Sequence, residues 1–155
     1  MNNNELLCRM TAEDCVKYKS KLAEFYKKNI DSCSYIDNFT LEDANLKIDS
    51  LIEHVYNKKA IVYGYFDECS LVGYIWAYEH KYRDEERVYV SEIRVDENFR
   101  GKGIGHKLLQ AVENAALELG YKAMYIHTEA SNKGAIRLYE NEGYELERVQ
   151  LRKQL

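Results

Sequence analysis

The chain has 155 residues, of which 46% are hydrophobic and 31% charged, a length and composition that predict one soluble domain over residues 1–155. Its formal net charge of −4 argues against a general nucleic-acid binder, which carries a basic excess, and leaves room for a cationic substrate. No apolar run approaches the ~18 residues of a membrane span, and the N-terminus has no signal-peptide pattern. We therefore expect a cytoplasmic protein without a nucleic-acid or membrane partner.

The first third of the chain shows mainly helical patterns. It predicts a short strand over Leu6–Met10, a helix from the N-cap Thr11 to about Lys28, a polar irregular stretch over Asn29–Phe39, and a helix from the N-cap Thr40 to about Val55.

The middle of the chain is rich in Val, Ile and Tyr, as strands are. It predicts strands over Ala60–Phe66, Leu71–Tyr78 and Val88–Val95, the first two joined by a turn at Asp67–Ser70. The remainder predicts a helix over Gly103–Leu119, a strand over Met124–Thr128, a helix over Asn132–Glu142 and a last strand over Tyr144–Arg152. This order favours a mixed α/β (α+β) domain.

The third of those strands changes its alternation part-way. Val88 and Val90 place apolar side chains at even positions, whereas Ile93 and Val95 place them at odd positions. A strand exchanges its faces only through an extra residue, so the pattern predicts a β-bulge near Ser91–Ile93. The alternative is a central strand that is apolar on both faces.

A glycine-rich run, Arg100-Gly101-Lys102-Gly103-Ile104-Gly105-His106-Lys107, follows this strand and precedes a helix. Glycines let the backbone approach a ligand, and a helix N-terminus with nearby cations favours an anion. The alternative is a plain strand-to-helix turn. A P-loop needs Gly-Lys-Ser/Thr at the end of the run, and a dinucleotide fingerprint needs glycine where His106 stands, so a generic nucleotide-binding domain is disfavoured.

Two segments carry a resemblance to a known family. Arg100, Gly103 and Gly105 form Arg-x-x-Gly-x-Gly, which resembles the coenzyme A pyrophosphate loop of the GNAT superfamily of acetyl-coenzyme A-dependent N-acetyltransferases. The segment Thr128–Tyr144 resembles the second signature of that superfamily, with Asn132 and Ala135 at its cofactor-contacting positions and Tyr139 at its catalytic tyrosine.

This resemblance implies a mostly antiparallel central sheet, flanked by helices, with a splayed pair of parallel strands that receives the pantetheine arm. Acetyl-coenzyme A is the implied co-substrate, and no metal is expected, since the four cysteines form no Cys-x-x-Cys pair and lie beside no His cluster. The cofactor-binding residues that we expect are Ile93, Arg94, Val95, Arg100, Gly101, Lys102, Gly103, Ile104, Gly105, His106, Asn132, Ala135 and Tyr139.

Aminolysis of a thioester needs a base for the amine and a proton donor for the leaving thiolate. The family position and the reference pKa of about 10 predict that Tyr139 is the donor. Glu92, on the predicted bulge, is the expected base, and His127 on the neighbouring strand is its rival. Both assignments have a plain alternative, in which Tyr139 only packs and Glu92 is a solvated carboxylate.

No cysteine lies near either motif in the sequence, so we expect direct transfer in a ternary complex. The acids of Asn29–Phe39 and Glu145–Val149 favour a cationic acceptor such as a polyamine, an aminoglycoside, or a peptide or protein amine. The alternative function is a non-catalytic acyl-coenzyme A sensor on the same fold. The sequence leaves open whether the chain is a monomer or a homodimer.

Overall fold

A computed structural model describes residues 5–33 and 36–155. Its centre is a five-stranded sheet in the order β1-β2-β3-β4-β5, in which every neighbouring pair is antiparallel except β4 and β5. The strands are β1 (Glu5–Arg9), β2 (Ala60–Asp67), β3 (Ser70–Tyr82), β4 (Glu85–Val95) and β5 (Met124–Ile126). The predicted mixed fold with one parallel pair is confirmed.

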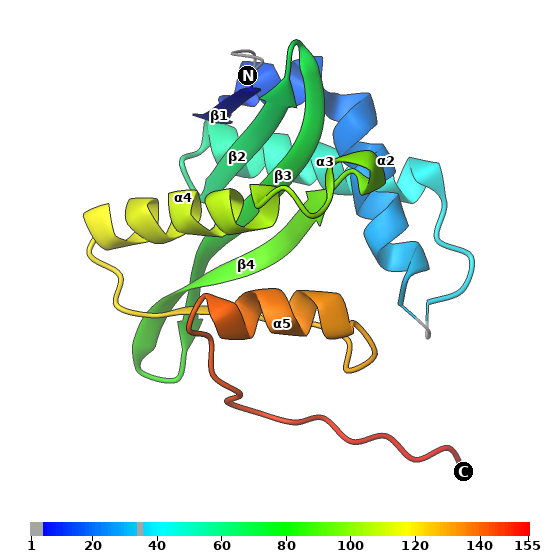
Figure 1. Ribbon diagram of the computed structural model, residues 1–155, viewed down its shortest axis with the longest axis vertical. Helices are drawn as coiled ribbons and strands as arrows, with labels where there is room; N and C mark the ends of the chain where they lie inside the picture. Colours follow the sequence, from blue (N-terminus) through cyan, green and yellow to red (C-terminus); the bar gives the residue numbers. More distant parts are fainter. Residues whose placement is uncertain (1–4, 34–35) are drawn as a thin grey trace.

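Helices cover both faces of this sheet, with α4 on one face and α2 and α3 on the other (Figure 1). They are α1 (Ala12–Lys17), α2 (Lys19–Asp31), α3 (Leu41–Tyr56), the short 3-10 helix η1 (Glu97–Phe99), α4 (Ile104–Glu118) and α5 (Lys133–Asn141). Thr11 and Thr40 each form a capping box, as expected from the acidic residue three positions later.

The sheet separates two hydrophobic clusters. On one side α2 and α3 bury Leu22, Phe25 and Ile48 against Tyr74 of β3. On the other side α4 packs on residues such as Ile75 and Val90, and α5 adds Tyr139 to this second cluster. The two faces of β3 and β4 therefore meet different helices.

Two predicted boundaries in the helical part differ from the structure. The helix expected over Thr11–Lys28 is divided at Tyr18, whose backbone departs from helical values (φ −100°, ψ 14°). The Tyr18 ring packs on Phe66, and its hydroxyl donates to the Cys69 carbonyl at 3.2 Å, so contacts with the β2–β3 turn accompany the break. α2 then continues to Asp31, into the stretch expected to be irregular; residues 34 and 35 of that stretch lie outside the described residues.

The parallel pair β4–β5 is short and then splays. Pairing runs from Val88↔Met124 to Val90↔Ile126 and ends there, two residues before the predicted end of β5 at Thr128. The last five residues of β4 therefore have a strand neighbour on one side only, which opens the gap expected between the two strands.

The predicted strand over Tyr144–Arg152 is wrong. In residues 142–155, all of which the structure describes, no strand forms, and the chain leaves the body of the molecule (Figure 1). Tyr144 still packs on Tyr139, but Leu146 and Leu151 are 84% and 90% exposed. Strand preference depends on a neighbouring strand and a face to bury, and the segment meets neither.

Within residues 5–33 and 36–155, no helix is both long enough and apolar enough to cross a membrane. In the same residues no three His, Cys, Asp or Glu side chains gather as a metal site would require. All four cysteines are free thiols.

Candidate active site

One extra residue in β4 forms the predicted β-bulge. Trp76 of β3 pairs with Glu92, whereas the next residue, Ala77, pairs with Val90. Ser91 thus has no partner opposite it, which is the defining feature of a bulge. The prediction of a bulge near Ser91–Ile93 is confirmed.

The bulge decides which way Glu92 faces. Apolar residues before and after it belong to the cluster beneath α4; they are Val88, Val90, Ile93 and Val95. Because the extra residue inverts the alternation, Glu92 lies on the opposite face, toward α2. If Ser91 were paired in a regular ladder, Glu92 would continue the series of Val88 and Val90 and point into the α4 cluster.

Asn29, near the end of α2, holds Glu92 in place. Its amide nitrogen donates to the Glu92 carboxylate at 2.5 Å and to the Ile93 carbonyl at 3.4 Å, and its amide oxygen accepts from the Arg94 guanidinium at 2.9 Å. Sequence reasoning missed Asn29, which was assigned to an irregular stretch. The available signal was a polar residue seven positions after Leu22, on the stripe of α2 that faces the sheet.

The environment of Glu92 shifts its titration to neutral pH. Burial raises the pKa of the Glu92 carboxyl to about 7, although the hydrogen bond from Asn29 and the charge of Arg94 oppose the rise. A carboxyl with this pKa is poised to accept a proton near neutral pH.

Unmet hydrogen-bonding capacity is concentrated around Glu92. Among the described residues, the buried side-chain atoms without a hydrogen-bond partner are the Tyr74 hydroxyl, Trp76 Nε1 and Arg94 Nε. In the β3–β4 register Trp76 stands opposite Glu92 and Tyr74 opposite Arg94. Buried polar atoms rarely lack a hydrogen-bond partner, so three such atoms close together in the sheet set this region apart from the rest of the described core.

Tyr139 lies on α5 and is 8% exposed. Burial and, second, the charge of Glu92 raise the pKa of the Tyr139 phenol to about 12. Tyr139 belongs to the same hydrophobic cluster as Val90 and Ile93 of β4, which lie on either side of the bulge, so it packs near the part of the strand that carries Glu92. At neutral pH the Tyr139 hydroxyl keeps its proton and is able to donate a hydrogen bond.

The glycine-rich loop leaves open space at the start of α4. Gly101 and Gly103 both have a φ of +75°, and a Cβ added at either would meet no atom within 4 Å. Gly103 is the N-cap of α4 and supplies no side-chain cap, so the first amides of the helix from Ile104 onward face the open loop.

The cations of this loop do not all face the same way. The Arg100 guanidinium donates to the Val95 carbonyl at 3.3 Å, and Lys102 lies over an aromatic ring of η1 at 4.7 Å. Lys107, expected to add charge to the loop, instead donates to the Tyr65 hydroxyl of β2 at 3.0 Å. Its contribution to an anion site is therefore smaller than expected.

Gly105 and His106 join α4 to α5. A Cβ at Gly105 would lie 3.0 Å from a methyl of Leu138, so Gly105 permits the two helices to approach. His106 Nδ1 hydrogen-bonds the Glu142 carboxylate at the end of α5. These two residues have a packing role whether or not they also touch a ligand.

The backbone of β4 offers hydrogen-bonding groups to the splayed gap. Asp96 N–H donates to the Val72 carbonyl of β3 at 2.8 Å. Because backbone groups alternate sides along a strand, those of Ile93 and Val95 point away from β3, toward the gap. Their carbonyls accept side-chain hydrogen bonds at 3.4 Å and 3.3 Å, contacts that are long enough to be exchanged readily.

The remaining predicted residues lie at the other wall of the gap. Asn132 is the N-cap of α5, where its side-chain oxygen accepts from the Ala135 N–H at 3.2 Å. His127, the rival base, is exposed and packs on the rings of Tyr89 and Tyr125, at centroid distances of 5.4 Å and 5.7 Å.

Two cavities lie away from these residues. One of about 1280 Å³ opens where the end of α3 meets the start of β2, and one of about 490 Å³ lies between α1 and α3. Neither is lined by any predicted site residue. The polar and titratable residues instead gather along the open gap between β4 and β5, which is where we place the candidate site.

Residues 22–144 match the model of the Acetyltransferase (GNAT) family. The chain belongs to this family. It is 27% identical over 152 residues to the uncharacterized N-acetyltransferase YdgE of Bacillus subtilis (strain 168), which covers 94% of this chain and 95% of that protein. A segment of 65 residues is 40% identical to the D-amino-acid N-acetyltransferase HPA3 of Saccharomyces cerevisiae, covering 42% of this chain and 40% of that protein.

Solved structures share the fold of this GNAT protein. An aminoglycoside acetyltransferase, meta-AAC0020 from an uncultured soil sample, in complex with sisomicin, superposes with a TM-score of 0.74 at 17% identity, covering 99% of this chain and 98% of that one. Aminoglycoside N-acetyltransferase AAC(6')-Iy in complex with CoA gives 0.76 at 15% identity, with 97% and 94% covered. The chain is thus an N-acetyltransferase of the GNAT type, a family that uses acetyl-coenzyme A.

Replacing Asn29 with Ala is expected to raise the pKa of Glu92. Asn29 donates a hydrogen bond to the charged carboxylate, and such bonds contribute about 1.5–3 kcal/mol, so the Glu92 titration should move upward by about one pH unit or more. Carbon NMR of the Glu92 carboxyl measures this directly. Asn45→Ala on the exposed side of α3 is the matched control. An unchanged midpoint in Asn29→Ala would contradict the hydrogen bond.

Proposed function

We propose that this GNAT enzyme transfers an acetyl group from acetyl-coenzyme A directly to a primary amine, with Glu92 as the base and Tyr139 as the hydrogen-bond donor to the leaving sulfur. The observation that carries the proposal is the bulge, which turns the Glu92 carboxyl toward Asn29 where the β4–β5 pairing ends. Burial raises the pKa of this carboxyl to about 7, which suits a base.

The loop before α4 and the gap fit the coenzyme. Bound acetyl-coenzyme A supplies the activated acyl group as a thioester. Positive-φ glycines without neighbours leave room for a pyrophosphate at the helix N-terminus, and the outward-facing groups of β4 can bond amides as an added strand does. The residues proposed to hold it are Ile93 and Val95 through their backbone, Arg94 between them, and Arg100, Gly101, Lys102, Gly103, Ile104, Gly105, His106, Asn132, Ala135 and Tyr139.

The two side chains have complementary tasks. An alkyl ammonium has a pKa of about 10.4, so a base must remove one proton before the amine can attack a carbonyl. Above pH 7 the Glu92 carboxylate is available for this, directly or through one water. A phenol with a pKa of about 12 is a weak acid, so Tyr139 stabilises the departing thiolate mainly by donating a hydrogen bond.

Cys33 lies closer to this site than the sequence suggested. Its thiol contacts the Asn29 carbonyl at 3.6 Å, and burial together with the charges of Glu129 and Glu92 raises its pKa. The thiolate is the nucleophilic form, so Cys33 is held in its unreactive state. This supports direct transfer in a ternary complex over an acetyl-cysteine intermediate.

A cationic acceptor remains our proposal. Glu92 and Glu129 place negative charge around the Cys33 end of the site. Two of the acids first considered are paired within the protein: Asp31 with Lys27 at 2.7 Å, and Glu147 with Arg87 at 2.8 Å. The sisomicin complex of meta-AAC0020 concerns a polycationic ligand on the same fold, which is compatible with this class.

Acetyl-coenzyme A should stabilise the protein against heat. At 100 times its Kd a ligand adds about 2.7 kcal/mol, which for this chain length raises Tm by about 5–11 °C. Gly103→Asp should abolish the rise, because the carboxylate repels a pyrophosphate. Gly120→Asp, at the far end of α4, is the control, since Gly120 has a similar positive φ and equally open surroundings. Differential scanning calorimetry without any rise in the wild type would remove the basis of the proposal.

Glu92→Gln should lower kcat/KM with an amine acceptor by about 10²–10⁴-fold. It should also remove the rise in rate with increasing pH that is centred near 7, because Gln has no proton to lose. His127→Gln should retain both the rate and the rise. A thiol-release assay across pH 5.5–9 measures these profiles, and the reverse pattern would assign the base to His127.

Tyr139→Phe should reduce kcat by about a hundredfold and leave the affinity for acetyl-coenzyme A nearly unchanged. Phe keeps the buried ring and loses only the donor, whose hydrogen bond strengthens as the thiolate forms. Tyr144→Phe is the matched control, a neighbouring half-buried phenol at 5.8 Å between ring centroids. Full turnover in Tyr139→Phe would show that this tyrosine only packs.

A further inference from the structure

Beyond Glu92, the α2 side of the sheet continues as a set of adjoining rings. We call this set, Tyr78, His80, Tyr89, Tyr125 and His127, the aromatic floor. Tyr78 of β3 stands opposite Tyr89 of β4, which stands opposite Tyr125 of β5. The ring centroids are 5.3 Å apart for the first pair and 4.8 Å for the second, and the two histidines flank them.

The floor is continuous with the proposed catalytic carboxylate. The bulge at Ser91 puts Tyr89 and Glu92 on the same face of β4. The charge of Glu92 is one of the causes that raise the pKa of the Tyr89 phenol, after burial and Tyr78. Tyr78, Tyr89 and Tyr125 are half-buried, and the two histidines are exposed. A ligand whose amine reaches Glu92 therefore has ring faces beside it.

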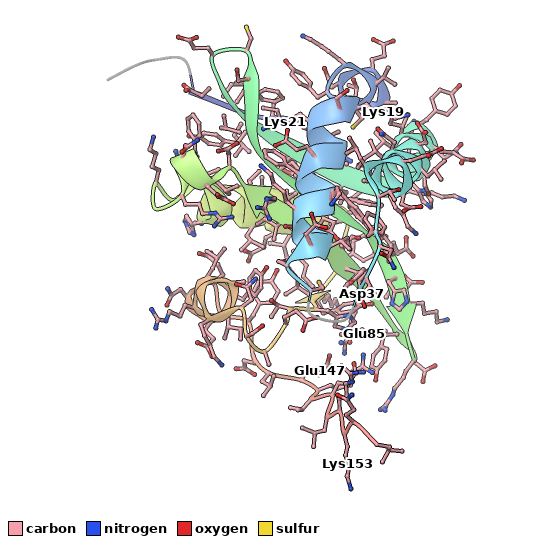
Figure 2. All side chains as sticks on the ribbon, turned by 90° about the vertical axis from the view of Figure 1, so that its right-hand side faces the viewer. Lys19, Lys21, Asp37, Glu85, Glu147 and Lys153 are labelled. Carbon is pink, nitrogen blue, oxygen red and sulfur yellow. The ribbon has the colours of Figure 1, made fainter. Side chains whose placement is uncertain are left out.

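The protein itself places cations on this surface at its far end. The Arg87 guanidinium lies over the Tyr82 ring at 5.0 Å and over Tyr125 at 6.0 Å, and Arg148 of the C-terminal segment lies over Tyr82 at 4.5 Å. Glu85 and Glu147, which hold Arg87, appear together below α2, whereas Lys153 points away at the tip of the segment (Figure 2). Rings that hold a cation on their faces are thus a property of this part of the sheet.

We propose that the aromatic floor is a subsite for a second cationic group of the acceptor, so that the preferred substrate is a dication. Its reacting amine lies at Glu92, and its second ammonium or guanidinium lies on Tyr89 and Tyr125, about 7 Å away, the spacing of same-face positions on a strand. The inference rests on the proposed function, because it takes Glu92 as the position of the reacting amine.

The ring faces and the carboxylate are complementary to such a ligand at both ends. A cation over a partly desolvated aromatic ring is attracted by the ring quadrupole, whereas an uncharged alkyl end gains only contact with the ring. The floor should therefore separate a diamine from a monoamine of the same chain length.

Calorimetric titration in the presence of coenzyme A tests this with 1,5-diaminopentane and n-pentylamine. We expect the wild type to bind the diamine about 3–30-fold more tightly. Tyr125→Leu should remove most of that ratio, and Tyr125→Phe, which keeps the ring, should retain it. Equal binding of the two amines by the wild type, or an unchanged ratio in Tyr125→Leu, overturns the proposal; so does a ratio lost equally in Tyr125→Phe, because the hydroxyl would then be responsible.

The same amines in a thiol-release assay separate this inference from the proposed function. Turnover of both amines without a diamine preference would retain the acetyltransferase mechanism and reject the floor. A diamine preference in binding without any turnover would support the floor and reject the catalytic roles of Glu92 and Tyr139. If Tyr125→Leu does not fold, as judged by its thermal melting, the wild-type affinity ratio and the Tyr125→Phe variant decide the outcome.

Discussion

The position of the Glu92 carboxyl depends on Ser91 having no partner in the β3–β4 ladder. A strand that keeps strict alternation commits each side chain to one face, and the α4 face of β4 is needed for the hydrophobic cluster on both sides of the bulge. The extra residue lets Ile93 and Val95 resume that packing while Glu92 and Arg94 turn toward α2. The pairing with β5 ends at Val90, immediately before this point, so the bulge and the opening of the gap coincide.

Burying the Glu92 carboxyl disfavours its charged form, and the neighbouring residues offset only part of this electrostatic cost. Desolvation raises the pKa of Glu92, whereas Asn29 and Arg94 favour its charged form. The balance of these effects leaves the pKa of Glu92 near neutral pH, so the carboxyl is not held permanently in its charged form. Asn29 links both side chains through one amide, so the end of α2 acts as a positioning element for the site.

Much of this arrangement could be predicted from local patterns. The change of apolar positions between Val90 and Ile93 predicts the bulge, and the glycine spacing predicts the loop before α4. Both features depend only on residues that are close together in the sequence. Asn29 was missed because its role depends on residues more than 60 positions away. The prediction of a final strand was wrong for a similar reason: the residues of 144–152 do not say whether a partner strand lies within reach. The direction of Lys107 likewise follows from the packing of β2 beneath α4.

The separation of the two sheet faces also bears on how such an enzyme diversifies. The loop before α4 and the apolar cluster beneath it occupy one side, and the aromatic floor occupies the other, with only the last residues of β4 shared between them. Mutations that exchange rings on the α2 side leave the residues beneath α4 untouched. Selection can therefore act on the two surfaces almost independently, so that lineages sharing one activated donor can acquire different acceptors by replacing a few side chains on the α2 side.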